Sequence, residues 1–385
     1  MGITLLFLFQ LWTQPSTRIM GFGNNFADFV PDYINDFIQN PAYLKIMNEY
    51  AEYNFPQVYS SIRSFNSTTS TEIMSDKEFY DNDELMSIGF LYPKLGLAGR
   101  YGIWQRRTGI GYGSDGFLRL FGQAGLSGAL NILKWINIGG EYNCSWNNRP
   151  DSLILITYDS LGGYYAHISE LIWSNEIGIG ILLHKNPLEF SASGKINYEN
   201  ENFTSDIPFY FERGPEGLLT AFETNYYDLK FNTRLRYNPN NFTHTINFNC
   251  FRKQIARDGV NHSMDYYLTA FRPGIGTVYY PKKNFLTIAS VSYEIDNIDY
   301  VVYPGTTTTD QNVIGLIGFE AQLSRILNFR FGNTLSYNSH YGIKQTKNDI
   351  CFGVDIMPYE KMIFNIATSN PLDYKYYFFG INFIF

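Results

Sequence analysis

The feature that most constrains the fold is a period-two alternation of apolar and polar residues, which recurs from about residue 85 onward. Each alternating segment is about ten residues long, the length of a strand that crosses a membrane. Between Asp228 and Tyr237 the apolar parity is Leu229, Phe231, Leu235 and Tyr237, and the other parity is wholly polar. Similar patterns occupy residues 189–198, 326–338 and 350–356. The pattern predicts two-faced strands.

The number of these segments distinguishes between two all-β architectures. A soluble sandwich of two sheets also alternates, but we count 14 to 18 strand-like segments, a range typical of single-chain outer-membrane barrels. We therefore predict an all-β fold, a transmembrane antiparallel up-and-down β-barrel of about 14 strands, with 16 possible, because weak neighbouring segments can be hairpins within loops.

The connections alternate in length, as expected for short periplasmic turns and long extracellular loops. The expected turns are residues 131–135, 185–187, 324–327 and 357–361. The expected loops are residues 105–117, 199–216, 254–263, 304–312 and 339–347.

Composition agrees with a membrane barrel. Aromatic residues make up 18% of the 385 residues, enough to line two membrane interfaces, whereas charged residues are only 17%. No window approaches the 18 consecutive apolar residues of a transmembrane helix. The net charge is −7 and there is no long run of Lys and Arg, so we expect no nucleic-acid partner.

Both ends of the chain carry expected targeting signals. Residues 1–16 contain the apolar run Ile3–Trp12 and are expected to be a signal peptide. No Lys or Arg precedes the run, which leaves two alternatives, a truncated signal peptide or a tract of another kind. The last ten residues alternate and end in an aromatic residue, which is typical of the closing strand and sorting signal of bacterial outer-membrane barrels. The signal residues are Ile381, Phe383 and Phe385. The expected location is the bacterial outer membrane, with membrane lipid and the barrel-assembly machinery as partners.

Residues 17–53 differ from the rest of the chain. Asp and Asn next to Pro mark turns and helix starts, and the apolar residues between Pro31 and Asn48 fit two short amphipathic helices. A Gly21-Phe22-Gly23 motif, an acidic stretch and then Asn40-Pro41-Ala42 resemble the entry segment of the FadL-like outer-membrane transport proteins, including the PorV-type branch.

The resemblance covers about 30 residues directly and the remaining barrel only by pattern. It implies that residues 17–53 form a plug inside the barrel of residues 54–385, and that Asn40, Pro41 and Ala42 belong to the plug. Asn24, Asn25 and Phe26 replace the small residues usual after Gly-x-Gly, and Tyr43 stands where Gly is commoner. The alternative is an ordinary turn that opens a helix.

We find no motif for catalysis or for a cofactor. The five histidines are dispersed, and the three cysteines, Cys144, Cys250 and Cys351, lie far apart in strand-like segments, so we expect no metal site and no disulfide framework. Gly178-Ile179-Gly180 lacks the third glycine of a dinucleotide motif, and its glycines are better explained as small residues on a crowded face. We expect no enzymatic activity, although Ser, His and Asp from separate strands could still assemble a hydrolase.

The polar parity of the strands places charged residues in the lumen if the apolar parity faces lipid. The strongest candidates are Lys230, Arg234, Arg236, Arg330, Asp349 and Asp355. The row of Lys230, Arg234 and Arg236 could attract an anionic head group. Alternatively, mixed charges pair across the lumen and hold the plug, because unpaired buried charges are costly.

These observations favour a monomeric barrel for passive passage of small hydrophobic or amphipathic compounds. Two alternatives remain: a PorV-like barrel whose loops hold secreted partners, and a structural barrel without a transport role.

Overall fold

The computed structural model describes residues 19, 22, 24–47, 57–66, 82–92, 97–106, 117–158, 162–209, 219–258, 266–300, 307–340, 343–359, 362–369 and 375–384. The N-terminal segment contains η1 (Asn24–Asp28), α2 (Tyr33–Gln39), η2 (Pro41–Tyr43) and α3 (Leu44–Met47). The strands are β1 (Gln57–Asn66), β2 (Asn82–Tyr92), β3 (Leu97–Arg106), β4 (Phe117–Leu133), β5 (Ile136–Tyr158), β6 (Gly162–Lys185), β7 (Leu188–Phe209), β8 (Leu219–Tyr237), β9 (Phe242–Asp258), β10 (Tyr266–Lys282), β11 (Phe285–Tyr300), β12 (Thr307–Ser324), β13 (Leu327–His340), β14 (Ile343–Tyr359), β15 (Met362–Ser369) and β16 (Lys375–Ile384).

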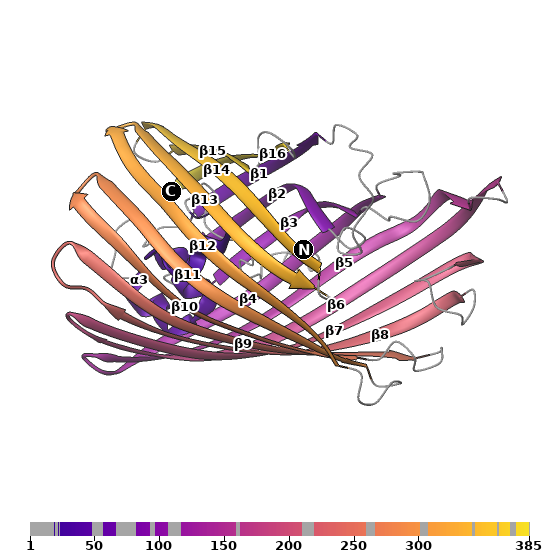
Figure 1. The fold of residues 1–385 in the computed structure, drawn as a ribbon. Coiled ribbons are helices and arrows are strands. Elements are labelled where there is room, and N and C mark those ends of the chain that lie inside the picture. Colours follow the sequence, from indigo (N-terminus) through magenta and orange to yellow (C-terminus); the bar gives the residue numbers. More distant parts are fainter. Residues whose placement is uncertain are drawn as a thin grey trace.

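The strands form one closed antiparallel barrel in which each strand pairs with its neighbours in sequence (Figure 1). The ring closes where β1 pairs with both β2 and β16, with Val58 opposite Phe90 on one side and Phe383 on the other. The described strands number sixteen, so the preferred number of 14 was too low. β1 is therefore a full member of the ring.

Several strands are longer than the alternation predicted. β5, β6 and β7 have 23, 24 and 22 residues, and parts of the expected loops are strand, including residues 199–209 and 307–312. Residues 307–312 are polar on both parities, whereas residues 199–209 begin polar and carry Phe203, Ile207 and Phe209 on one parity. Cross-strand hydrogen bonds such as Asn200 Nδ2 to Asn225 Oδ1 (2.9 Å) join the extensions to their neighbours. Backbone pairing therefore continues beyond the segments of clear alternation.

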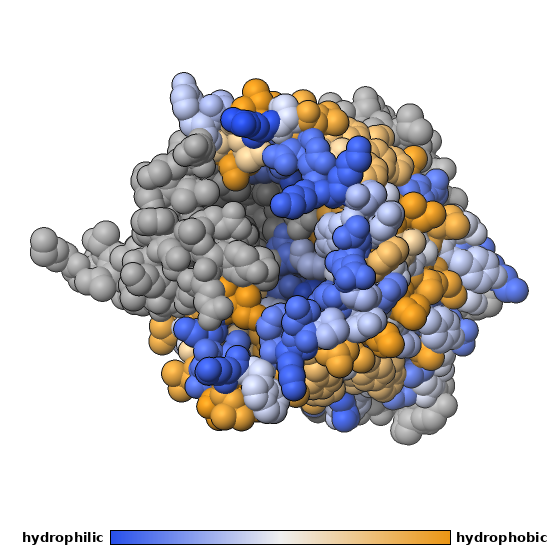
Figure 2. Space-filling view, turned by 90° about the vertical axis from the view of Figure 1, so that its left-hand side faces the viewer, coloured by the Kyte–Doolittle hydropathy of each residue, from blue (hydrophilic) through white to orange (hydrophobic). Residues whose placement is uncertain are grey.

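The two faces of the strands point as their periodicity predicts. In β8, Leu229, Phe231 and Leu235 are 51%, 44% and 40% exposed on the outside, whereas Arg234 and Arg236 are buried. An exposed apolar outer surface surrounds a polar interior. Figure 2 shows the end of the barrel with the short turns, where hydrophilic residues line a central hollow and apolar residues lie around the outside.

The N-terminal segment lies inside the barrel and forms most of the buried core (Figure 1). The two predicted amphipathic helices correspond to α2 and the η2–α3 pair. Within the described residues, no helix has the length and hydropathy needed to cross a membrane. Cys144, Cys250 and Cys351 are free thiols.

Candidate functional site in the barrel lumen

Local sequence chemistry fixes the shape of the N-terminal segment. Asp32 caps helix α2 by accepting a hydrogen bond from the Asn35 backbone N–H (3.1 Å). Asn40 ends α2 in an extended conformation, as expected before a proline, and its Oδ1 then caps η2 by accepting from the Ala42 backbone N–H (2.9 Å). Asn40 and Pro41 therefore end one helix and begin the next.

Asn40 also attaches the segment to the barrel wall. Its Nδ2 donates to the carbonyl oxygens of Ile181 (3.0 Å) and Ala192 (3.1 Å), which belong to adjacent strands β6 and β7. The wall provides room for this contact because residue 180 is a glycine, and a Cβ there would overlap the Asn40 side chain. Likewise, a Cβ at Gly139 would overlap the backbone of Pro41 and Ala42.

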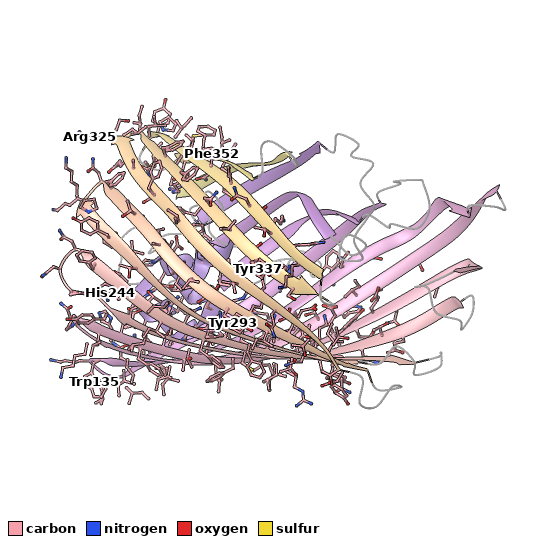
Figure 3. All side chains as sticks on the ribbon, in the orientation of Figure 1. Trp135, His244, Tyr293, Arg325, Tyr337 and Phe352 are labelled. Carbon is pink, nitrogen blue, oxygen red and sulfur yellow. The ribbon has the colours of Figure 1, made fainter. Side chains whose placement is uncertain are left out.

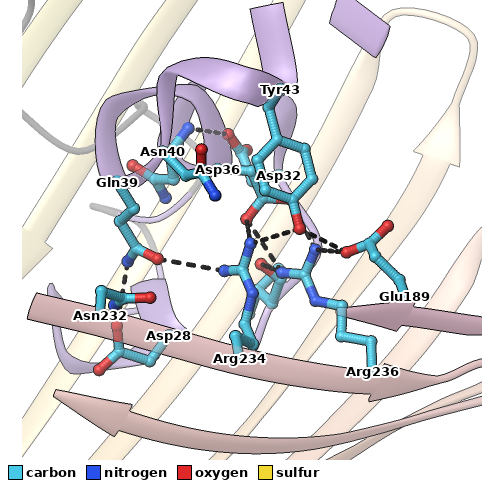
Figure 4. A network of polar contacts seen from close by, with 12 residues as sticks. Asp28, Asp32, Asp36, Gln39, Asn40, Tyr43, Glu189, Asn232, Arg234 and Arg236 are labelled. Atoms are coloured by element: carbon cyan, nitrogen blue, oxygen red, sulfur yellow. Dashed lines mark hydrogen bonds and ion pairs between the residues drawn. The ribbon is translucent and has the colours of Figure 1, made fainter. Parts of the chain in front are cut away.

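Asp36 binds two arginines of β8 at once (Figure 4). Its Oδ1 accepts from Arg234 Nη2 (2.8 Å) and Arg236 Nη2 (3.0 Å), and its Oδ2 accepts from Arg236 Nη1 (2.6 Å). All three side chains are almost fully buried. Glu189 of β7 provides the second carboxylate, 3.2 Å from Arg236 Nη1, so two cations and two anions balance.

Tyr43 connects the two sides of this network. Its hydroxyl donates to Glu189 Oε1 (2.5 Å) and accepts from Arg234 Nη2 (3.0 Å). Burial raises the pKa of Tyr43 above its ordinary value, which keeps the hydroxyl protonated and able to donate. Tyr43 therefore joins the N-terminal segment to the arginine pair. We call Asp36, Tyr43, Glu189, Arg234 and Arg236 the lumen network.

β7 also binds the carboxyl end of α2. Lys195 Nζ donates to the Ile38 carbonyl oxygen (2.8 Å), and Ser193 Oγ donates to the Gln39 carbonyl oxygen (2.7 Å). A cation at the carboxyl end of a helix satisfies free carbonyl groups and favours the helix dipole. Lys195 is itself paired with Glu141 of β5 and lies 3.3 Å from Glu176 of β6.

The remaining candidate charges lie apart from the lumen network. Lys230 is half-exposed and lies 3.8 Å from Glu176, so the predicted row of three cations is divided between two groups. Arg330 pairs with Asp355 and, at 2.6 Å, with Glu320, its cross-strand neighbour. Asp349 lies 3.4 Å from exposed Lys347. Of the C-terminal residues, Ile381 and Phe383 lie in β16, whereas Phe385 lies outside the described residues.

A second, apolar contact holds the first part of the N-terminal segment. Ile19, Phe22, Phe26, Phe29 and Val30 pack against inward-facing residues of β10, β11 and β12. The wall residues are Val278, Leu286, Ile288, Ile314 and Leu316. Sequence reasoning missed this patch, although Val313–Ile317 is apolar on both parities except for Gly315. Such a run indicates a strand that is covered on both faces.

These features define the class of protein. A closed antiparallel barrel with an apolar outer surface and a polar, charge-paired lumen is a transmembrane β-barrel of the bacterial outer-membrane type. Among the described residues, no group of three or more His, Cys, Asp or Glu side chains could hold a metal ion.

Comparisons with known proteins gave similar solved structures only. The toluene transporter TodX of Pseudomonas putida is 13% identical, with a TM-score of 0.43 over 97% of each chain. The toluene transporter TbuX of Ralstonia pickettii is 10% identical, with a TM-score of 0.41 over 93% of this chain and 94% of that one. The FrpB iron transporter of Neisseria meningitidis is 8% identical, with a TM-score of 0.49 over 85% of this chain and 56% of that one. No family model and no curated protein sequence matches.

Proposed function

We propose that this barrel gives small hydrophobic or amphipathic compounds a passive path across the outer membrane, with residues 17–53 as a plug inside the barrel of residues 54–385. The observation that carries the proposal is the position of the described N-terminal residues, which occupy the lumen and contact both a polar and an apolar part of its wall. Passage then requires the segment to move or rearrange.

The chemistry of the lumen supports an amphipathic cargo. The wall of β10–β12 is apolar where it contacts the phenylalanines of the segment, and the wall of β7–β8 carries paired charges. A compound that follows this path meets apolar and polar surfaces side by side. The proposed plug role of Asn40, Pro41 and Ala42 rests on their burial and on the two bonds from Asn40 to the wall.

Passive passage involves no chemical step, so it needs neither a cofactor nor an energy source. The alternative of a barrel that holds secreted partners depends on extracellular loops, and residues 107–116, 210–218, 259–265 and 301–306 lie outside the described residues.

The test is uptake of a labelled fatty acid or hydrocarbon by cells with and without the gene. We expect faster uptake with the gene, and uptake that still rises with external concentration after the proton gradient is collapsed. Equal uptake in both strains would contradict the proposal. The strains must have the same general permeability to a small polar dye, which separates specific passage from a damaged membrane.

A further inference from the structure

The short-turn end of the barrel carries a set of exposed cations that the lumen does not use. They are Lys134, Lys185, Lys282, Lys283 and Arg325, and all are exposed. None forms an ion pair within the described part of the chain. The five cations lie in or beside the short turns between strands. No Asp or Glu occurs among the described residues of these turns, nor in residues 238–241 and 357–359, which lie at the same end of the barrel. We call these five residues the basic rim.

The basic rim contrasts with the rest of the molecule. The whole chain has a net charge of −7, and exposed carboxylates such as Glu223 and Asp299 lie near the opposite ends of their strands. Figure 3 labels Trp135 and Arg325 at the turn end, and the same end in Figure 2 is largely hydrophilic around its opening. The five cations thus share the short-turn end, whereas near the other end exposed cations such as Lys344 and Lys347 occur together with exposed carboxylates.

Apolar residues extend right up to these cations on the outer surface. Ile132 and Leu133 are 59% and 49% exposed beside Lys134, and Leu323 and Ile326 are 64% and 54% exposed on either side of Arg325. Trp135 follows Lys134 and is 44% exposed. Lipid-facing side chains next to a Trp and a cation mark the level where acyl chains meet headgroups.

The spacing of the rim favours lipid over a compact partner. The cations lie on the turns β4/β5, β6/β7, β10/β11 and β12/β13, and successive turns of a barrel are two strands apart, about 10 Å at the usual strand spacing. These turns are spread around about half of the ring. Lipid surrounds a barrel on all sides, whereas a small acidic protein would need the charges on one patch.

We propose that the basic rim binds the anionic headgroups of phospholipids in the leaflet at the short-turn end. Lys and Arg side chains extend to the phosphate level and enrich acidic lipid around the barrel, because each cation near an anionic surface contributes favourably to binding. The contact anchors the barrel at a fixed depth and does not depend on the proposed passage of cargo.

Trp135 follows Lys134 in sequence, so its fluorescence can report which lipids lie beside the basic rim. The experiment uses the full chain in vesicles of phosphatidylcholine and phosphatidylglycerol, with Trp12, Trp104, Trp146 and Trp173 replaced by Phe so that Trp135 is the remaining one of five tryptophans. One lipid at a time carries bromine on its acyl chains, and quenching of Trp135 is compared at equal mole fraction. We expect brominated phosphatidylglycerol to quench about twofold or more better than brominated phosphatidylcholine at low salt.

Two matched double variants decide the outcome. Lys134→Gln with Lys185→Gln should bring the ratio close to one, whereas Lys344→Gln with Lys347→Gln, exposed cations near the other end, should leave it unchanged. Native mass spectrometry of the chain with all its tryptophans provides a second measurement of retained phosphatidylglycerol. A ratio near one in the parent, or equal retention by the parent and the Lys134/Lys185 variant, would overturn the proposal and favour an acidic protein partner.

Discussion

Asp36 is the residue on which the lumen network most depends. One carboxylate satisfies two buried guanidinium groups that come from the same strand, so its removal leaves cations that the rest of the network cannot neutralise. The side chain comes from a helix of only seven residues, which is too short to be stable alone. Helix α2 and its partners in β8 therefore stabilise each other.

Replacement of Asp36 by Asn should release α2 from the wall. The loss of a buried ion pair costs about 3 kcal/mol or more, which corresponds to a roughly hundredfold rise in local opening. Hydrogen exchange of the backbone amides of residues 35–47 measures this opening. Asp299→Asn, which changes an exposed carboxylate that bonds Thr307 at 2.6 Å, should leave these amides unchanged. Unchanged exchange in the Asp36 variant would mean that the ion pairs do not hold the segment.

Asn40 combines two roles that different substitutions separate. Asn40→Ala removes both the cap on Ala42 and the two bonds to Ile181 and Ala192, for a cost of about 1–3 kcal/mol in docking free energy. Asn40→Asp keeps the cap but loses the donors and places a carboxylate near two carbonyl oxygens. We expect both variants to raise exchange in residues 41–47. Protection close to that of the parent in Asn40→Asp would show that the cap alone fixes the segment.

At the scale of secondary-structure elements, the barrel wall is shaped to receive the segment. Glycines on the inward face of β5 and β6 lie where the backbone and side chains of residues 40–42 make closest approach. Larger wall residues would occupy the same space. The segment thus docks by steric fit as well as by charge.

Two neighbouring glycines of β5 test this fit. In Gly139→Ala the new methyl group would overlap the backbone of Pro41 and Ala42. In Gly140→Ala the new methyl group would have only the Gly178 carbonyl oxygen as a neighbour, at the ordinary contact distance of 3.9 Å. We expect Gly139→Ala to increase exchange in residues 40–47 at least tenfold, the effect of about 1.4 kcal/mol, while Gly140→Ala does not. Equal protection in the two variants would show that the wall has room to spare.

The apolar contact between the N-terminal segment and β12 can be tested with a second matched pair of variants. Leu316 is 1% exposed against the phenylalanine cluster, and Ile317 is 65% exposed on the lipid side of the same strand. Leu316→Ala should weaken docking of residues 24–30 by about 2–5 kcal/mol, because it leaves a cavity under the cluster. Ile317→Ala should leave that docking intact. Hydrogen exchange of residues 26–30 separates the two results, and equal protection would contradict the assigned packing.

The sequence predicted the strands much better than the contacts between distant parts of the chain. Alternation identified the two faces of β7, β8, β13 and β14, because lipid and lumen impose opposite polarity on successive residues. It could not predict the strand extensions at residues 199–209 and 307–312, where clear alternation is lost. Asp36 was visible as part of an acidic stretch, but its pairing with Arg236 spans 200 positions, and period-two patterns contain no information about that distance.

At the scale of the whole molecule, the charged lumen is largely neutralised internally. In the lumen network, two arginines pair with carboxylates of the segment and of β7. Elsewhere in the lumen, Lys195 pairs with Glu141 and Arg330 pairs with Asp355. Of the two sequence hypotheses for Arg234 and Arg236, the geometry favours pairing with the segment, because Asp36 forms ion pairs with both arginines. The basic rim remains as the exposed charge at the turn end.

We propose that residues of the N-terminal segment close the lumen of the barrel. The decisive measurement is the conductance of the purified protein in a planar bilayer, with Gly139→Ala and Gly140→Ala measured beside the parent. We expect low conductance for the parent and for Gly140→Ala, and frequent opening to a larger conductance for Gly139→Ala. A steady, high conductance of the parent, equal to that of Gly139→Ala, would instead show an open bore that the segment does not close.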